Sequence, residues 1–189
     1  MMATPGGVST KALQPLAWGV TLITFCVGLN IGIWQGSWSA HGPTIHIVMQ
    51  PVFGLWVHNA SIVVLAFLGI LSFGMVTWFV VFWNGINFGY IAMMTIHYYG
   101  VLIMLGGILP HGIFEIPADL MACQADIMCV GTVARYVLHR PVTPSEGPHS
   151  MMPVLRLAAK RNLVALGLLG IAAIIESFVT PMILQGLLH

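Results

Sequence analysis

The stretch VHNASIVVLAFLGILSFGMVTWFVVFWNGINFGYIAMMTI, from Val57 to Ile96, contains no Asp, Glu, Lys or Arg. A single bilayer-spanning helix needs only about 20 apolar residues, so this stretch is long enough for two helices. In hydrocarbon the backbone must satisfy its own hydrogen bonds, which makes helices the expected form. We therefore predict two membrane-spanning helices, 57–73 and 76–96, that are joined by a tight turn at Gly74.

Apolar sequence continues on both sides of this stretch. Similar runs at 16–34, 101–121 and 163–188 predict three further spans. Only 6% of the 189 residues are charged, whereas a soluble domain carries about 25%, so the chain lacks the polar surface that a soluble fold requires. We expect one all-α, polytopic transmembrane domain over residues 1–189, with five helices embedded in the lipid bilayer.

The first run, 16–34, has a second interpretation. Ser37 and Ser39 resemble the small residues of a signal-peptide cleavage site. The apolar core of a signal peptide is only about 7–15 residues long. Because the run is longer than that, we interpret it as the first transmembrane helix.

The fourth predicted helix contains Pro110 and Pro117. Proline removes a helical hydrogen bond and clashes with the preceding turn, so we predict that this helix is kinked or broken. The apolar character then fades through Asp119 and Asp126. We therefore predict that the span ends near residue 121 and that 123–162 forms a cytoplasmic connector.

The basic residues indicate how the helices are oriented. The chain has six, namely Lys11, Arg135, Arg140, Arg156, Lys160 and Arg161. With five spans at the predicted positions, all of them lie on the side that holds the N-terminus, whereas four or six spans would divide them. Cytoplasmic segments are enriched in Lys and Arg, so we predict the N-terminus inside and the C-terminus outside. The six residues form no continuous basic stripe, and we expect no nucleic-acid partner.

Small residues recur at intervals of four on two of the predicted helices. The first helix carries Gly28, Gly32 and Gly36, and the third carries Gly85 and Gly89. Lipid tails are as apolar as the helices, so helix association in a membrane depends on close packing, which glycines allow. We interpret these residues as helix-packing positions, either within the chain or against a second copy or another membrane subunit.

Four polar residues inside the apolar stretches form the most specific feature. His111 and Glu115 are four residues apart and share one face of the fourth helix, while Glu176 lies in the fifth helix and Asn84 in the third. At 1.5 Å per residue, His111 and Glu176 lie about 16 and about 18 Å below the outer ends of their helices. An ionised carboxyl near the bilayer centre costs about 3 kcal/mol. We therefore expect a buried cluster in which one of the two neighbouring carboxyls retains a proton.

This predicted cluster of His111, Glu115 and Glu176 is compatible with three roles. It could be a structural polar contact that fixes the register of the helices, or a relay for protons or ions. Histidine and carboxylates also bind zinc or iron, which makes the three residues metal candidates. The pattern requires no cofactor, and we predict none.

Sequence signatures of enzymes are absent. The chain has no HExxH, GxSxG, P-loop or GxGxxG sequence. Its three cysteines, Cys26, Cys123 and Cys129, match no metal-binding spacing, and we interpret them as reduced packing residues. We therefore favour a protein that is not an enzyme.

Three segments resemble a known family. HGIFEIPA at 111–118, AAIIESFVTP at 172–181 and NGINFG at 84–89 are similar, in order and spacing, to the signature of the stage II sporulation protein M family of bacterial and archaeal membrane proteins. The resemblance covers the chain from about Val57 to its end. It implies a multi-pass protein of the cytoplasmic membrane. It also marks the matching polar positions, namely Asn84, Gly85, His111, Glu115 and Glu176, as family-signature residues rather than as a known active site.

The resemblance also suggests a function. The sporulation member of the family is a membrane scaffold that works with two cell-wall-degrading proteins, although most relatives lack that role. We accordingly expect a non-enzymatic membrane subunit that organises partner proteins and associates with other subunits or with itself. The first alternative is a transporter or channel for a small solute or ion that uses the buried His/Glu cluster. The second is a metal-dependent intramembrane hydrolase.

Overall fold

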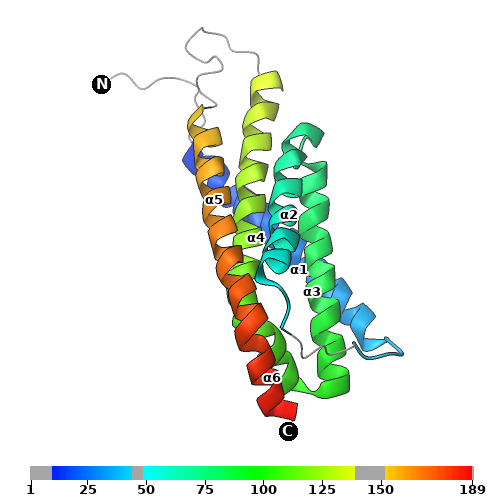
Figure 1. The fold of residues 1–189 in the computed structure, drawn as a ribbon. Coiled ribbons are helices and arrows are strands. Elements are labelled where there is room, and N and C mark those ends of the chain that lie inside the picture. Colours follow the sequence, from blue (N-terminus) through cyan, green and yellow to red (C-terminus); the bar gives the residue numbers. More distant parts are fainter. Residues whose placement is uncertain (1–9, 44–48, 139–151, 189) are drawn as a thin grey trace.

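The structure is a computed structural model that describes residues 10–43, 49–138 and 152–188. Within these ranges the chain forms a bundle of helices without a strand (Figure 1). The predicted all-α class is confirmed, and five helical segments of the described residues are long and apolar enough to cross a membrane, which is the predicted number. The elements are α1 (Thr10–Ser37), α2 (Val52–Leu68), η1 (Gly69–Ser72), α3 (Met75–Tyr99), α4 (Val101–Leu138), α5 (Met152–Ile174), η4 (Ile175–Val179) and α6 (Thr180–Leu188).

The turn between α2 and α3 lies where the sequence predicts it. The chain leaves η1 and turns at Phe73 and Gly74, whose φ angles are 52° and 88°. Glycine adopts such a left-handed conformation without steric cost. The Gly74 N–H closes the turn by donating to the Gly69 carbonyl at 2.8 Å. The start of α2 differs from the prediction, because the helix begins at Val52 rather than at residue 57.

α4 is one continuous helix that includes Pro110 and Pro117. The helix is therefore not broken at the prolines, and a kink at either position stays a prediction. Membrane helices tolerate proline when neighbouring groups or small backbone adjustments satisfy the freed carbonyl.

The predicted connector, 123–162, requires a correction. Residues 123–138 continue α4, and α5 begins at Met152, so helices occupy both ends of that range. The middle of the predicted connector, 139–151, lies outside the described residues. The last span also needs a correction. The hydropathy pattern predicted that it starts at residue 163, but α5 begins at Met152.

The error has a physical cause, because the polar residues that suggested an early end of the span are paired across helices. Arg161 on α5 donates a hydrogen bond to Gln124 on α4. Asn162 Nδ2 donates to Asp126 Oδ1 at 3.3 Å. Such interhelical hydrogen bonds allow polar residues to remain inside a bundle, and hydropathy alone does not reveal them.

The last predicted span consists of three consecutive elements. α5 continues without a loop into the π-helix η4 and then into α6. The Thr180 N–H donates to the Ile175 carbonyl, which is the wide spacing of a π turn. Pro181 follows directly, and its ring crowds the preceding turn of a regular helix. A wider turn ahead of a proline relieves this crowding, and π turns occur often at functional sites.

α1 and α3 pack backbone to backbone through the five predicted glycines. A methyl group added to any of them would collide with main-chain atoms of the facing helix. The residue numbers of the contacting positions increase together on the two helices, so α1 and α3 run in the same direction. The glycines therefore serve a contact within this chain. The contacts are Gly28 with Phe82, Gly32 with Ile86, Gly36 with Tyr90, Gly85 with Phe25 and Gly89 with Leu29.

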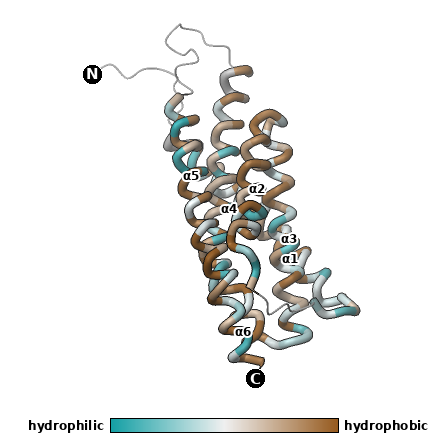
Figure 2. Tube along the Cα trace, in the orientation of Figure 1, coloured by the Kyte–Doolittle hydropathy of each residue, from teal (hydrophilic) through white to brown (hydrophobic). Residues whose placement is uncertain are grey.

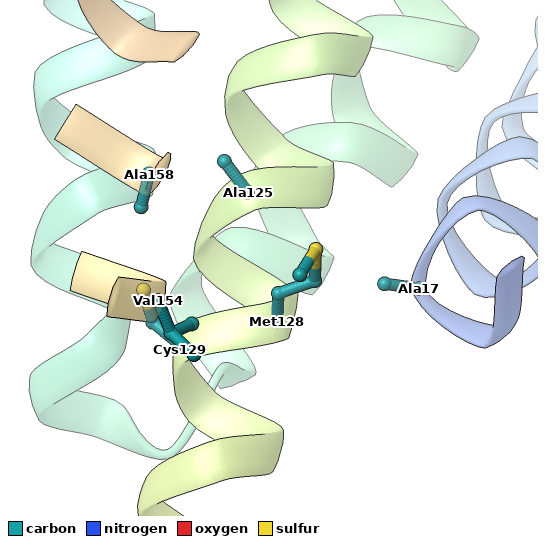
Figure 3. Close-up of a cluster of buried hydrophobic side chains, with 6 residues drawn as sticks. All are labelled: Ala17, Ala125, Met128, Cys129, Val154 and Ala158. Carbon is teal, nitrogen blue, oxygen red and sulfur yellow. The ribbon is translucent and has the colours of Figure 1, made fainter. Parts of the chain in front are cut away.

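A second packed region joins α1, α4 and α5 (Figure 3). It consists of small or flexible side chains: Ala17, Ala125, Met128, Cys129, Val154 and Ala158. The cysteines are free thiols, of which Cys123 and Cys129 are buried while Cys26 is exposed. Hydrophobic residues also cover much of the outside of the helices (Figure 2). An apolar exterior is what a bundle in lipid requires.

Candidate functional site

A partly open cavity of about 390 Å³, with polar groups in its otherwise apolar wall, lies between the helices; we call it the polar cavity. α3 and α4 form two of its walls, α2 forms a third, and η4 contributes one carboxyl. Apolar side chains complete the wall, and no Lys or Arg occurs among the described lining residues. The polar lining consists of His58, Asn59, Asn84, Asn87, His111, Glu115, Asp119 and Glu176.

The short second helix extends along only part of this polar wall. The Ser177 hydroxyl donates to the carbonyl of Gln50, just before α2, at 2.5 Å. At 1.5 Å per residue, Ser177 lies about 16 Å from Leu188 along the last span. α2 therefore starts partway along the bundle, as Figure 1 shows. Trp56 anchors its first turn by donating through Nε1 to the Leu166 carbonyl at 3.0 Å.

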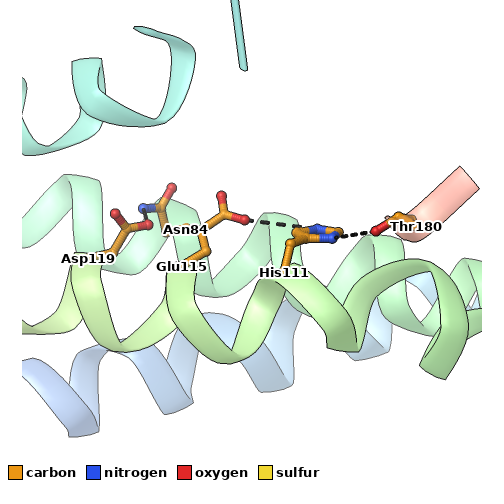
Figure 4. A network of polar contacts seen from close by, with 5 residues as sticks. All are labelled: Asn84, His111, Glu115, Asp119 and Thr180. Carbon is orange, nitrogen blue, oxygen red and sulfur yellow. Dashed lines mark hydrogen bonds and ion pairs between the residues drawn. The ribbon is translucent and has the colours of Figure 1, made fainter. Parts of the chain in front are cut away.

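α4 supplies a row of three polar residues at intervals of four, namely His111, Glu115 and Asp119 (Figure 4). Residues at this spacing lie on one helix face. His111 Nε2 and Glu115 Oε2 are 3.9 Å apart. One turn further, Asp119 Oδ2 accepts a hydrogen bond from Asn84 Nδ2 on α3 at 3.3 Å. The other carboxyl oxygen of Asp119 is buried and has no hydrogen-bond partner.

The last span reaches the same cavity from the opposite side. Thr180 Oγ1 lies 3.4 Å from His111 Nδ1, within hydrogen-bond distance. Glu176, in the π turn, lines the cavity together with Glu115. The structure thus brings the four predicted polar residues, Asn84, His111, Glu115 and Glu176, to one cavity. Their role stays a prediction.

Sequence reasoning missed two ionisable members of the site, Asp119 and His58. We took Asp119 as the sign of a fading span, although its spacing of four from Glu115 placed it on the same face. His58 showed no ligand-like spacing to any other histidine, and only the packing of α2 against α4 brings it to the cavity. Local spacing could have identified Asp119, but no local signal identifies His58.

The charges of the wall limit what the cavity can hold. Glu115 lies close enough to both Asp119 and Glu176 for these carboxylates to repel it when they are ionised. A cation, or protons on the carboxyls, would remove this repulsion. In the described part of the chain, no group of three or more His, Cys, Asp or Glu side chains is arranged to hold a metal ion. Zinc or iron at His111, Glu115 and Glu176 therefore stays a prediction without geometric support.

Comparison with known proteins gives a family match. The family model described as Stage II sporulation protein M matches residues 21–181, a range that contains every polar residue of the cavity wall. An uncharacterized protein of Methanocaldococcus jannaschii is 30% identical over 135 residues, which cover 69% of this chain and 71% of the relative. No solved structure matches the chain.

Proposed function

This chain belongs to the stage II sporulation protein M family, and on that premise we propose that it binds a small cation in its polar cavity and carries it across the membrane. The supporting observation is the charge of the cavity wall. Glu115, Asp119 and Glu176 face one space whose described lining contains no Lys or Arg. We further propose that the protein lies in the cytoplasmic membrane of a bacterium or an archaeon, which the similar archaeal protein of M. jannaschii supports.

The size and the energetics of the cavity support binding. Its volume of about 390 Å³ falls in the range of about 300–1,000 Å³ that is typical of small-molecule sites. Ionisable side chains inside a membrane protein are costly, and they commonly line pathways for ions, protons or substrates. A cation bound between the carboxyls would offset their mutual repulsion.

The extent of the cavity supports movement across the membrane. Its lining runs along α4 from Ile108 to Cys123, which is about 22 Å at 1.5 Å per residue. This is most of a hydrocarbon core of about 30 Å. We propose that the cation enters on the side of the C-terminus, where α2 does not cover the wall. At the other end, the Arg161–Gln124 and Asn162–Asp126 contacts would have to separate for release.

Uptake by liposomes that contain the purified protein tests this proposal. Radioactive sodium serves as the inorganic probe and radiolabelled methylammonium as the organic one. We expect uptake of at least one probe above that of protein-free liposomes. E176Q and E115Q should abolish it, because they remove charge from the wall while keeping its shape. The same substitution at Glu146, outside the predicted spans, is the matched control and should leave uptake unchanged.

Two results would contradict transport: no uptake of either probe, or uptake that E115Q and E176Q leave intact. A partner chain that then co-purifies stoichiometrically in mild detergent, with wild type and E176Q alike, would support the scaffold that the resemblance implies. Stoichiometric zinc or iron in the purified protein, lost in E176Q, would instead support the metal-dependent hydrolase.

A further inference from the structure

A second buried polar group joins α4 to α5 beyond the inner end of the cavity. Asp126 is 0% exposed, and Asn162 is 9% exposed. Asn162 Nδ2 donates to Asp126 Oδ1 at 3.3 Å. The second oxygen of the carboxyl, Oδ2, and the amide oxygen of Asn162 are both buried, and neither has a hydrogen-bond partner. The pair therefore contains one satisfied contact and two orphaned acceptor oxygens.

Arg161 does not neutralise this carboxyl. It precedes Asn162 in the chain, but its guanidinium donates to Gln124 and approaches Met128 Sδ at 3.5 Å. Among the described residues, the one ion pair within 4.0 Å is that of His111 with Glu115. An ionised Asp126 would thus be a buried charge without a described cationic partner, which is a costly arrangement.

The other groups near Asp126 are weakly polar or apolar. α4 itself contributes the thiols of Cys123 and Cys129. Asp119 lies two turns away on the same helix, where it lines the cavity. α1 and η1 pack against this region through Ala17 and Ile70, which do not titrate.

We propose that Asp126 binds a proton and that the Asp126–Asn162 pair is a proton-binding site. One proton on Oδ2 would satisfy both orphaned oxygens, because Oδ2–H would donate to Asn162 Oδ1. Asn162 Nδ2–H already donates to Asp126 Oδ1. A carboxylic acid and an amide that pair through two hydrogen bonds carry no net charge. The pair would therefore be neutral and fully hydrogen-bonded, which are the two conditions for burying polar groups at low cost.

Other occupants satisfy the two oxygens less completely. A water molecule could donate to both, but the carboxylate would keep its charge without a described cationic partner. A metal cation would find two orphaned oxygens, whereas hard cations in proteins take about six or more oxygen ligands. The proton satisfies the hydrogen bonds and the charge together.

Because this site lies between α4 and α5 next to the inner end of the cavity, its protonation should affect the contact between the two helices. Asp126 follows Cys123, the last residue of α4 that lines the cavity, by three positions. Loss of the proton would leave a charged carboxylate opposite the amide oxygen of Asn162, and the contact between α4 and α5 would weaken there. The inference does not depend on the cation-transport proposal, because it follows from this pair alone.

Infrared spectroscopy of the purified full chain tests the proposal. The chain has only five acidic side chains, so carboxylic-acid carbonyl bands are few. We compare the protein with and without D126N, both in wild type and in an E115Q/D119N/E176Q background. At neutral pH we expect a protonated-acid band that D126N removes and that N162L shifts. A missing band, or a band that D126N leaves in place, would overturn the proposal.

Thermal unfolding provides a second measurement. An asparagine at position 126 can donate to Asn162 Oδ1 and accept from Asn162 Nδ2, as the protonated acid would. D126N should therefore keep the melting temperature of the wild type, while D126L and N162L should lower it. A loss in D126N as large as that in D126L would indicate that the carboxylate charge is required, and would also overturn the proposal.

Discussion

α1 packs against α3 through bare backbone, whereas α4 faces α2 and η4 across a polar cavity. At the first contact, Gly32 leaves no room for even a methyl group. At the second, Glu115 and Glu176 stand in a space of about 390 Å³. The same bundle therefore contains one closely packed helix pair and one cavity that polar side chains line.

This contrast shows how a small membrane protein can combine stability with a polar site. Without a hydrophobic driving force between helices, close packing must hold them together, and the α1–α3 contact provides it. The α4 side carries the costly polar groups. A rigid helix pair on one side of the bundle allows the other side to remain open, and substitutions on either side should separate the two contributions.

The largest effect is expected at the packed contact. In Gly32→Ala the new methyl group would meet the Ile86 carbonyl and force the backbones apart. Overpacking typically costs about 1–3 kcal/mol, and we expect at least the upper end because main chain rather than a side chain must move. Gly19→Ala on the same helix is the matched control, because nothing lies within 4 Å of its new methyl group. Thermal unfolding in detergent should show a large loss for the first variant and no loss for the second.

The residues that line the cavity should be more accessible to water than exposed residues that face lipid. His58 and Val64 are both exposed residues of α2, but only His58 lines the cavity. In a variant that lacks the three native cysteines, His58→Cys should react with a charged, membrane-impermeant thiol reagent, whereas Val64→Cys should be protected by lipid. Equal reaction at both positions, or at neither, would contradict a water-filled cavity. The side from which the reagent acts also tests the predicted orientation.

An intermediate effect is expected at the hydrogen bond between Asn84 and Asp119, which links α3 to α4 beside the cavity. Asp119→Leu removes the acceptor of the Asn84 amide, and an unsatisfied buried polar group costs about 1–3 kcal/mol. Asp119→Asn keeps an acceptor oxygen and should cost less. Unfolding temperatures of the two variants would rank them, and equal losses would show that charge rather than hydrogen bonding matters at this position.

The smallest effect is expected at the start of α2. Trp56→Phe removes the hydrogen bond to the Leu166 carbonyl, which is worth about 1 kcal/mol. The same substitution at Trp78, which is half exposed and is not among the residues that line the polar cavity, should have little effect. If both variants melt alike, the Trp56 bond does not fix the position of α2.

Much of the fold follows from local sequence patterns. The uncharged stretch Val57–Ile96 requires two helices, and Gly74 marks the turn between them. Prolines were a poorer guide, because α4 passes through Pro110 and Pro117 without a break. The ends of α4 and α5 were misplaced because Asp126 and Asn162 satisfy each other across the helix pair.

The candidate site was predictable only in part. The spacing of His111 and Glu115 on one helix indicates a shared face, and their depth suggested a meeting with Glu176. The inclusion of His58 depends on how far α2 extends along the bundle, and that depends on contacts such as Gln50 with Ser177. Contacts between residues so distant in the chain leave no periodic pattern in the sequence.

Composition alone indicates that this protein belongs in a lipid bilayer, because so few charges cannot cover a water-soluble surface. The sequence also specifies the helical class, the number of spans and the glycines that let helices approach, since hydrogen-bond satisfaction and local spacing dictate them. The pairing of the polar residues, in contrast, depends on how the helices pack against one another. This packing pairs Asp119 with Asn84 and Asp126 with Asn162, because a buried polar group is stable only beside a partner that another helix supplies.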